Sequence, residues 1–500
     1  MKYRIALTLF LSVIAAIATA QSWTMFYEGE NGFDYSWLNQ GVTDDMGNAV
    51  FVGTSGPSAD CRYAFIMSIR PDGTYATKVC FEENVETATL ANIIILPNGN
   101  YFTTGVKETT EGPFFDVIVF DPDLNIVSER QYAPEGKGED FCGTTQSVLD
   151  CNGNIVSTTV QMYDIQGYAA YHSGMLYRFT PEGDTIQHRD LYSEESPLNM
   201  GFTDYFCAFN LFYDCDQNEL LYLGRGLHNC GSLEYFDEDF NLVRAYKLEV
   251  SNSDTCYTIS GGPAQCHLKS FDEDLIIFDD DINQDIFASK VSLDGEIEKR
   301  IALRPMVDTI EDPALICCMA EMMDGNLCYY FDWYTFTYDS GVQCAYLIND
   351  DLEIVGSYSD DSGIRAYPRC IASTNDGGCI MVSDSMTLLN QTRIIPYFIK
   401  LMPDDFTMVP LSVQEKPASD CQGVYPNPAK DFVNINIQDI ENSNMNIRIC
   451  DVMGRMMTDR KVAGEGNTIV VDISQLKPGM YLYSIYNTQK ELLTGKFVKE

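Results

Sequence analysis

A short acidic segment carries oxygen ligands at a density that suits a hard cation. Asp279, Asp280, Asp281 and Asp285 supply four carboxylates within seven residues, and two amides lie among them. Ca²⁺ takes six to eight oxygen ligands, so the segment predicts calcium as the candidate cofactor. It lacks the full EF-hand pattern and its glycine. The alternative is an acidic loop that is simply exposed to water.

An aromatic segment at 332–339 is the second candidate site. Trp333, Tyr334 and Tyr338 alternate there with polar residues. Exposed aromatic side chains suit the apolar faces of sugar rings or the centre of a protein interface. We therefore predict these three residues as ligand-binding residues for a glycan or a protein. The alternative is that alternate side chains fill the core of a sheet as a strand continues.

Signatures of catalysis are few, and we assign no catalytic residue. The sequence has no H-E-x-x-H spacing, no G-x-S-x-G motif and no phosphate-binding G-x-x-x-x-G-K-[ST] motif. The four histidines are far apart in the chain: His172, His188, His228 and His267. Enzymatic activity therefore stays uncertain, and the sequence leans against it.

A two-part pattern that recurs seven times must position these segments. Turn signals rich in Asp, Asn and Gly, each followed by a strand-like run, lie at 45–48, 97–100, 150–154, 214–218, 271–274, 324–326 and 375–378. Hairpins with an acidic or glycine turn follow them at 65–73, 117–125, 175–183, 233–241, 287–295, 345–353 and 397–405. Each copy supplies four strands. The all-β pattern predicts a seven-bladed β-propeller over 21–410, in preference to stacked sandwiches or a solenoid.

The connections between the second and third strands of each blade are predicted to be long and dissimilar. They include 53–62, 107–114 and 161–173, as well as the acidic and aromatic segments. Variable loops on a rigid scaffold are where binding usually resides, so we place the ligand site on the face that carries them. Closing the ring needs one more strand. We expect 22–27 to complete or extend the seventh blade, beside a weak fourth strand at 406–409.

The charge of the chain excludes two classes of partner. The chain has 32 Lys and Arg against 73 Asp and Glu, a formal net charge of −41. All of the acidic excess lies between 21 and 420, because the last eighty residues hold equal numbers of each sign and the first twenty hold no Asp or Glu. Such a field repels nucleic acid and anionic membranes, so we expect neither as a partner.

The last eighty residues resemble a known family. The segments 432–437, 445–449, 468–472 and 481–485 alternate apolar and polar residues, which predicts a small Ig-like sandwich. Its motif residues are Tyr425, Pro426, Asn427, Pro428, Gly454, Gly479, Tyr481 and Lys496. In combination they resemble the type A C-terminal sorting domain of the Bacteroidetes type IX secretion system. The resemblance implies export through the outer membrane, contact with that machinery and its sorting peptidase, and then removal of the domain or its use as a surface anchor.

The N-terminus agrees with export. Residues 1–20 combine a basic start, an apolar run of about thirteen residues and an A-x-A cleavage site, which predicts a signal peptide. That run is too short for a transmembrane helix, and no other segment is long and apolar enough. The predicted domains are the signal peptide 1–20, the propeller 21–410, a linker 411–420 and the sorting domain 421–500. Export permits disulfides among the seventeen cysteines, but their spacing does not give the pairing.

These observations predict an exported, extracellular or surface-attached binding protein for a glycan or protein ligand. Two alternatives remain open at this point. One is a secreted propeller glycosidase or lyase, which needs only two or three carboxylates on the channel rim. The other is a structural component of the surface layer.

Overall fold

The chain, seen in a computed structural model, divides into two compact units, Met1–Pro410 and Leu411–Glu500. The structure describes residues 22–27, 35–58, 60–80, 85–134, 138–165, 168–191, 208–225, 231–248, 265–268, 274–280, 286–303, 312–322, 324–334, 341–360, 366–386, 394–408, 424–425, 427–436, 445–451, 456–462, 464–465, 468–486 and 491–500. The predicted signal peptide therefore lies outside the described residues. Among those residues no helix has the length and apolar character needed to cross a membrane.

The first unit consists of consecutive antiparallel meanders. The first two comprise β2 (Tyr35–Thr43), β3 (Ala49–Ser58), β4 (Cys61–Ile69) and β5 (Tyr75–Cys80), then β6 (Val85–Ile95), β7 (Tyr101–Thr109), β8 (Gly112–Phe120) and β9 (Ile126–Tyr132). The next two comprise β10 (Gly138–Leu149), β11 (Ile155–Ile165), β12 (Tyr168–Phe179) and β13 (Thr185–Asp190), then β14 (Ala208–Asp214), β15 (Glu219–Arg225), β16 (Gly231–Phe236) and β17 (Leu242–Lys247).

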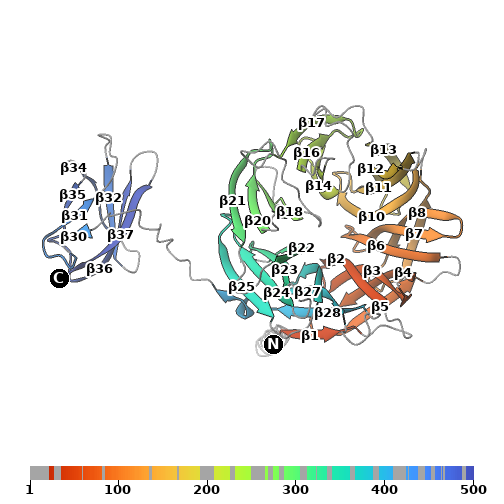
Figure 1. Cartoon of the computed structure of the whole chain (residues 1–500), viewed down its shortest axis with the longest axis horizontal. Helices are drawn as coiled ribbons and strands as arrows, with labels where there is room; N and C mark the ends of the chain where they lie inside the picture. The colour runs from red at the N-terminus through yellow and green to blue at the C-terminus, as the bar shows by residue number, and fades with distance from the viewer. Residues whose placement is uncertain are drawn as a thin grey trace, which may run out of the picture. The chain divides into compact units, whose positions relative to one another are not determined.

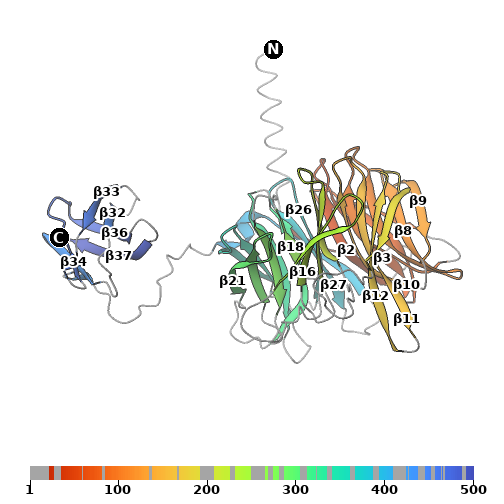
Figure 2. The same cartoon turned by 90° about the horizontal axis from the view of Figure 1, so that it is seen from above.

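The remaining meanders follow the same order. They comprise β18 (Gln265–His267), β19 (Leu275–Asp280), β20 (Ile286–Val291) and β21 (Ile297–Leu303), then β22 (Asp312–Glu321), β23 (Leu327–Tyr334), β24 (Gly341–Ile348) and β25 (Ile354–Asp360), and finally β26 (Ala366–Ser373), β27 (Cys379–Met386) and β28 (Ile394–Leu401). They are arranged in a ring, with the first strand of each meander nearest the centre (Figure 1). In the view turned by 90°, the strands run steeply between the two faces of the ring (Figure 2). This is a propeller-like, all-β domain.

The hydrophobic core of this unit lies between neighbouring meanders. Val50 and Val52 of β3 are fully buried in one cluster with Leu90 of β6 and Ile118 of β8. Burying each such side chain contributes roughly 1.5–3 kcal/mol. By contrast, the outer strands β5 and β9 are half exposed along their length. Each meander is therefore stabilised mainly by the next one in the ring.

The acidic turns begin the second strands as predicted. The Oδ1 atom of Asp44 accepts hydrogen bonds from the backbone N–H groups of Met46 (3.0 Å) and Asn48 (2.8 Å). Gly47 adopts φ +82°, a conformation that glycine tolerates best. The same carboxylate-capped turn recurs at Asp121, Asp150 and Asp237. A turn Asp therefore replaces backbone partners that a tight hairpin leaves unsatisfied.

The ring is closed by the N-terminal strand, which confirms the prediction for 22–27. β1 (Trp23–Phe26) pairs antiparallel with β28, with Trp23 opposite Lys400. Lys400 is fully buried, forms an ion pair with Asp376 and donates to the backbone oxygen of Pro71 at 3.4 Å. The indole N–H of Trp23 donates to the same oxygen at 3.4 Å. The closure therefore joins the last meander to the first.

The prediction for 406–409 is wrong. After the short 3₁₀ turn η1 (Pro403–Asp405), β29 (Thr407–Met408) pairs with β25, with Met408 opposite Gly356. The edge of β28 that a fourth strand would need is already occupied by β1. The segment therefore extends the preceding meander.

Several predictions of long loops are also wrong, because most of the residues in those segments belong to strands. β3 continues to Ser58 and β4 begins at Cys61, so 53–62 forms a tight hairpin. Similar hairpins replace the predicted loops 107–114 and 161–173. Polar residues in these strands bond across the sheet: Thr54 Oγ1 lies 3.1 Å from the backbone oxygen of Tyr63 and 2.7 Å from that of Ala88.

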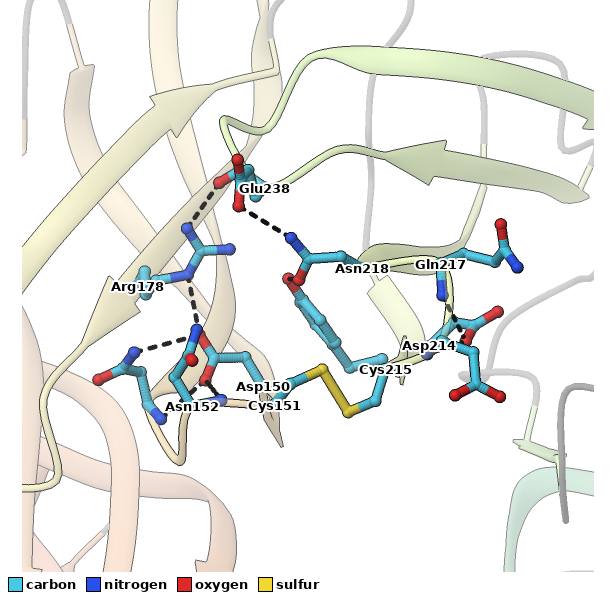
Figure 3. Close-up of a disulfide and its surroundings, with 12 residues drawn as sticks. Asp150, Cys151, Asn152, Arg178, Asp214, Cys215, Gln217, Asn218 and Glu238 are labelled. Atoms are coloured by element: carbon cyan, nitrogen blue, oxygen red, sulfur yellow. Dashed lines mark hydrogen bonds and ion pairs between the residues drawn. A yellow bond between two sulfur atoms is a disulfide. The ribbon is translucent and has the colours of Figure 1, made fainter.

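The turn face of the ring holds many contacts between meanders. The disulfide Cys151–Cys215 joins two neighbouring turns (Figure 3). Beside it, Arg178 pairs with Asp150 at 3.2 Å and donates to the backbone oxygen of Glu238 at 2.6 Å. Further inter-meander bonds run from Tyr101 to Asp44, Tyr132 to Gly183 and Tyr235 to Leu293. These groups fix one meander to the next.

The second unit is a sandwich of two four-stranded antiparallel sheets, as predicted. One sheet contains β30 (Val424–Tyr425), β31 (Phe432–Asn436), β35 (Thr468–Asp472) and β34 (Gly464–Glu465), and the other contains β33 (Met456–Val462), β32 (Met445–Asp451), β36 (Gly479–Tyr486) and β37 (Glu491–Lys499). Val433, Ile447, Ile485 and Phe497 are buried between the sheets.

Candidate ligand-binding site

The predicted aromatic site is only partly described. Trp333 and Tyr334 are the last two residues of β23, opposite Val342 and Gly341 of β24. The backbone there is strand where a loop was expected. Tyr338 lies outside the described residues. Ligand binding by these three residues remains a prediction.

The predicted calcium site is described even less. Asp279 and Asp280 end β19, whereas Asp281 and Asp285 lie outside the described residues. In the part of the chain that the structure does describe, no three His, Cys, Asp or Glu side chains come together as a metal site. Calcium binding therefore stays a prediction.

The structure brings a different set of side chains together around Trp37 of β2. The guanidinium of Arg62 lies over the indole ring, with its central carbon 4.7 Å from the ring centroid. The guanidinium carbon of Arg369, which belongs to β26, lies 5.8 Å from the same ring centroid. The ring of Tyr35 packs edge to face against the same indole ring, with the two ring centroids 5.1 Å apart. Stacking on an aromatic ring holds each guanidinium plane in place and leaves its N–H groups able to bind an anion.

The two arginines differ in how their charge is balanced. Arg369 forms an ion pair with Asp384 of β27. Arg62 has no hydrogen bond or ion pair with any residue that the structure describes, and its Nε is buried. Arg62 is half-buried, so its cation is held near the protein surface. In a chain of net charge −41, a cation without a partner among the described residues is unusual.

Asp384 is the most perturbed carboxyl group at the site. It is 2% exposed, and its Oδ1 has no hydrogen-bond partner among the described residues. Burial raises its pKa to about 6, although the charge and hydrogen bond of Arg369 act in the opposite direction. Desolvation therefore outweighs the ion pair. Near neutral pH the ionised carboxylate balances Arg369 alone.

These side chains lie on the face opposite the acidic turns. Tyr35 and Trp37 are near the start of β2, which runs toward the turn at Asp44. Arg62 follows the hairpin that begins β4, and Asp384 is near the end of β27, away from its turn. The cluster thus occupies the face on which we placed ligand binding, although its residues come from strands.

A second charge cluster is buried at its centre. Lys107 of β7 and Asp116 of β8 are each 2% exposed, with their charged atoms 3.6 Å apart, and Lys107 also pairs with Glu129 of β9. Burial raises the pKa of the nearby Cys80 thiol to about 12, helped by these carboxylates. The cluster joins three strands of one meander and is structural.

Sequence reasoning missed the Trp37 cluster because its members are far apart in the chain, and because Arg62 falls in the predicted loop 53–62 rather than in a strand. One local signal was available. Tyr35 and Trp37 alternate with Ser36 and Leu38, and only the latter two are buried. Two large, half-buried aromatic residues on the less buried side of an inner strand indicate a surface that can bind.

In the second unit, the motif residues connect the two ends of the sandwich. The Oδ1 atom of Asn427 accepts a hydrogen bond from the backbone N–H of Val498 at 2.8 Å. Ala429 forms an isolated parallel β-bridge with Lys499. Tyr481 is buried, stacks on Phe497 at 5.7 Å and donates its hydroxyl to the backbone oxygen of Lys477.

The other motif residues are at the surface or outside the described residues. Tyr425 and Lys496 are exposed on β30 and β37, and Gly479 begins β36 with φ +157°. Pro428 follows Asn427 through a cis peptide bond. Pro426 and Gly454 lie outside the described residues.

Comparisons with known proteins identify the second unit. Residues 423–500 match the family model described as "Secretion system C-terminal sorting domain". No curated protein matches the chain.

Solved structures resemble the chain only distantly. An acylaminoacyl peptidase from Pyrococcus horikoshii is 9% identical with a TM-score of 0.41, over 83% of this chain and 60% of the peptidase. A periplasmic gluconolactonase from Pseudomonas aeruginosa is 10% identical with a TM-score of 0.40, over 64% and 84% of the two chains. A chain of a mitotic checkpoint complex is 10% identical with a TM-score of 0.40, over 77% and 92%. The match thus spans 60% of the peptidase's length, and similarity at this level assigns no activity to the chain.

Proposed function

Because residues 423–500 are a secretion system C-terminal sorting domain, which implies export across the outer membrane, we propose that the chain is an exported binding protein for an anionic glycan. The first unit is a seven-bladed propeller that serves as a rigid scaffold. Arg62, Trp37 and Arg369 form the ligand site. The sorting domain delivers the propeller to the cell surface or the medium through the type IX machinery.

One observation carries the proposal. Arg62 is stacked on Trp37 at 4.7 Å and has no anionic partner among the described residues. A guanidinium presents a planar fork that matches a carboxylate or sulfate in two parallel hydrogen bonds, and such charge-assisted bonds are the stronger kind. Stacking reduces the freedom that the side chain would lose on binding. An acidic sugar supplies both the anion and an apolar ring face for neighbouring Tyr35.

The charge of the whole protein narrows the ligand further. A net charge of −41 repels a densely charged polyanion at long range, and salt screens this repulsion over about 8–10 Å. A glycan with separated carboxylates avoids most of that penalty. We therefore expect a polymer with scattered uronic acid residues to bind better than a densely sulfated one.

The test measures retention on immobilised polysaccharides and the release of reducing ends from the same samples. The panel contains a neutral glucan, a polymer with scattered uronic acids, heparin and mucin. Arg62→Met should weaken retention on the uronic acid polymer at least tenfold. Arg70→Met, which removes an exposed arginine at a turn of the opposite face, is the matched control and should change nothing.

Three outcomes would contradict the proposal. Equal retention on the neutral glucan would exclude anion recognition, and equal retention of the Arg62 variant would exclude this site. Released reducing ends would instead show a glycosidase or lyase and redirect attention to rim carboxylates.

A further inference from the structure

The boundary between the last two meanders contains a pair of buried thiols. Cys328 is the second residue of β23 and Cys379 is the first residue of β27. Their sulfur atoms are 3.9 Å apart, although the residues are separated by 51 positions in the chain. Both side chains are fully buried, and they share one apolar cluster with Cys318, Met381 and Leu401. A disulfide would bring these sulfur atoms from 3.9 Å to about 2.05 Å, and they are already neighbours in the folded chain.

A second observation comes from the opposite part of the ring. The disulfide Cys151–Cys215 already joins two neighbouring meanders across the turn face, over a sequence separation of 64. Cys328 and Cys379 lie at the corresponding ends of the second strands, immediately beyond the turns near Met322 and Thr374. The sorting domain takes the chain out of the cytoplasm, into compartments where disulfides form and persist. Both cysteine pairs therefore connect neighbouring meanders close to the turns that precede the second strands.

We propose that Cys328 and Cys379 are oxidised to a second inter-meander disulfide in the exported protein. One thiolate attacks the disulfide of a thiol oxidoreductase, forms a mixed disulfide and releases one thiol of the oxidant. The second thiolate attacks the mixed disulfide, forms the Cys328–Cys379 bond and releases the other thiol. In sum, two thiols of the chain lose two protons and two electrons, and one oxidant disulfide is reduced to a dithiol.

The burial of the pair determines when this reaction occurs. The thiolate is the reactive species, and the hydrogen bond to Cys379 together with burial raises the pKa of Cys328 well above its ordinary value. In the closed ring neither sulfur is accessible to an enzyme. Oxidation therefore precedes the packing of the last two meanders against each other. Once formed, the bond is protected from reductants by the same apolar cluster.

The direct test uses the full-length protein recovered from the culture medium or the cell surface. The protein is denatured in N-ethylmaleimide to block thiols and then digested without reductant, and the peptides are identified by mass spectrometry. The expected result is a linked pair of peptides that contains Cys328 and Cys379, separated into its two parts by reduction. Recovery of both peptides with alkylated thiols would overturn the proposal. A link from Cys328 to Cys318 would overturn it equally, because it would join strands of one meander.

A second measurement does not depend on peptide recovery. The Cys151→Ser/Cys215→Ser variant removes the other described disulfide, so a residual effect of reductant on its melting temperature reports the new bond. Unfolding and refolding in reductant should lower that temperature by roughly 3–8 °C, as expected for opening a loop of this length. Adding Cys328→Ser should abolish the difference, whereas adding Cys344→Ser, a buried cysteine in the next strand, should not. Equal melting temperatures with and without reductant in the starting variant would refute the bond.

Discussion

The pH dependence of stability depends on one buried carboxyl group. Asp384 is 2% exposed, and burial raises its pKa from 3.8 to about 6, in spite of its ion pair with Arg369. The Asp384 carboxylate in turn helps burial to raise the pKa of the neighbouring Cys370 thiol. Replacing Asp384 with Asn removes the titration and keeps a side chain of the same shape. The Asp384→Asn variant therefore isolates the cost of the buried charge.

The sign and size of this pH effect on stability follow from the pKa of Asp384 in the unfolded chain and its pKa in the folded protein. The folded protein binds the Asp384 proton more tightly than the unfolded chain does. The associated stability is therefore present below pH 3.8 and is lost as the pH rises through about 6. A shift of this size corresponds to about 3 kcal/mol, of which about 2.5 kcal/mol falls between pH 4 and pH 7. Over that interval the wild-type protein should lose about 2.5 kcal/mol relative to the variant.

Urea unfolding at several pH values measures this difference. All three tryptophans, Trp23, Trp37 and Trp333, lie in the first unit, so their fluorescence follows its unfolding without a contribution from the sorting domain. Taking the difference between wild type and variant cancels the titration of the other carboxyl groups. A difference that stays constant within about 0.5 kcal/mol from pH 4 to pH 7 would refute the reasoning about desolvation.

Three further predictions concern other parts of the chain. Lys107→Met removes the ion pair between Lys107 and the buried carboxylate of Asp116, and it should lower the free energy of unfolding in urea by about 3–5 kcal/mol. The control Lys78→Met, at an exposed position, should change that free energy little, and equal effects of the two substitutions would contradict this. Deleting 21–28 removes the strand that closes the ring and should lower the melting temperature sharply in calorimetry, and an unchanged melt would exclude that role. Deleting the last twenty residues removes β37 and the partner of Asn427, so fractionation should find the protein trapped in the periplasm; normal surface display would contradict the role of the sorting domain.

The regular part of the fold could be predicted because local residues determine it. A carboxylate such as that of Asp44 or Asp150 caps its own turn within four residues, so each turn signal indicates a hairpin wherever it occurs. The extent of the strands could not be predicted in the same way. Thr54 and Ser55 fall in the predicted loop 53–62, but Thr54 bonds to backbone oxygens and Ser55 pairs with the Ser36 hydroxyl. Such partners lie on other strands.

The candidate site depended almost wholly on three-dimensional placement. Trp37, Arg62, Arg369 and Asp384 belong to four strands at the two ends of the propeller sequence, and only ring closure brings them together. No spacing in the chain indicates that pairing. The same holds for Cys151 and Cys215, whose separation of 64 residues matches no familiar disulfide pattern. The motifs of the sorting domain could be predicted from the sequence, because all of them lie within eighty consecutive residues.

The position of the closing strand has a consequence for assembly. The hydroxyl of Ser22, just before β1, bonds to Asp405, 383 residues further along the chain. Loop closure over this distance costs about 5 kcal/mol of chain entropy. A chain that is translocated from its N-terminus presents β1 long before β28 arrives, and until then the first strand has no partner within its own molecule. At high local concentration it can pair with β28 of another copy. The ring therefore has a built-in route to domain-swapped dimers, favoured by crowding at the site of export and opposed by fast completion of the chain.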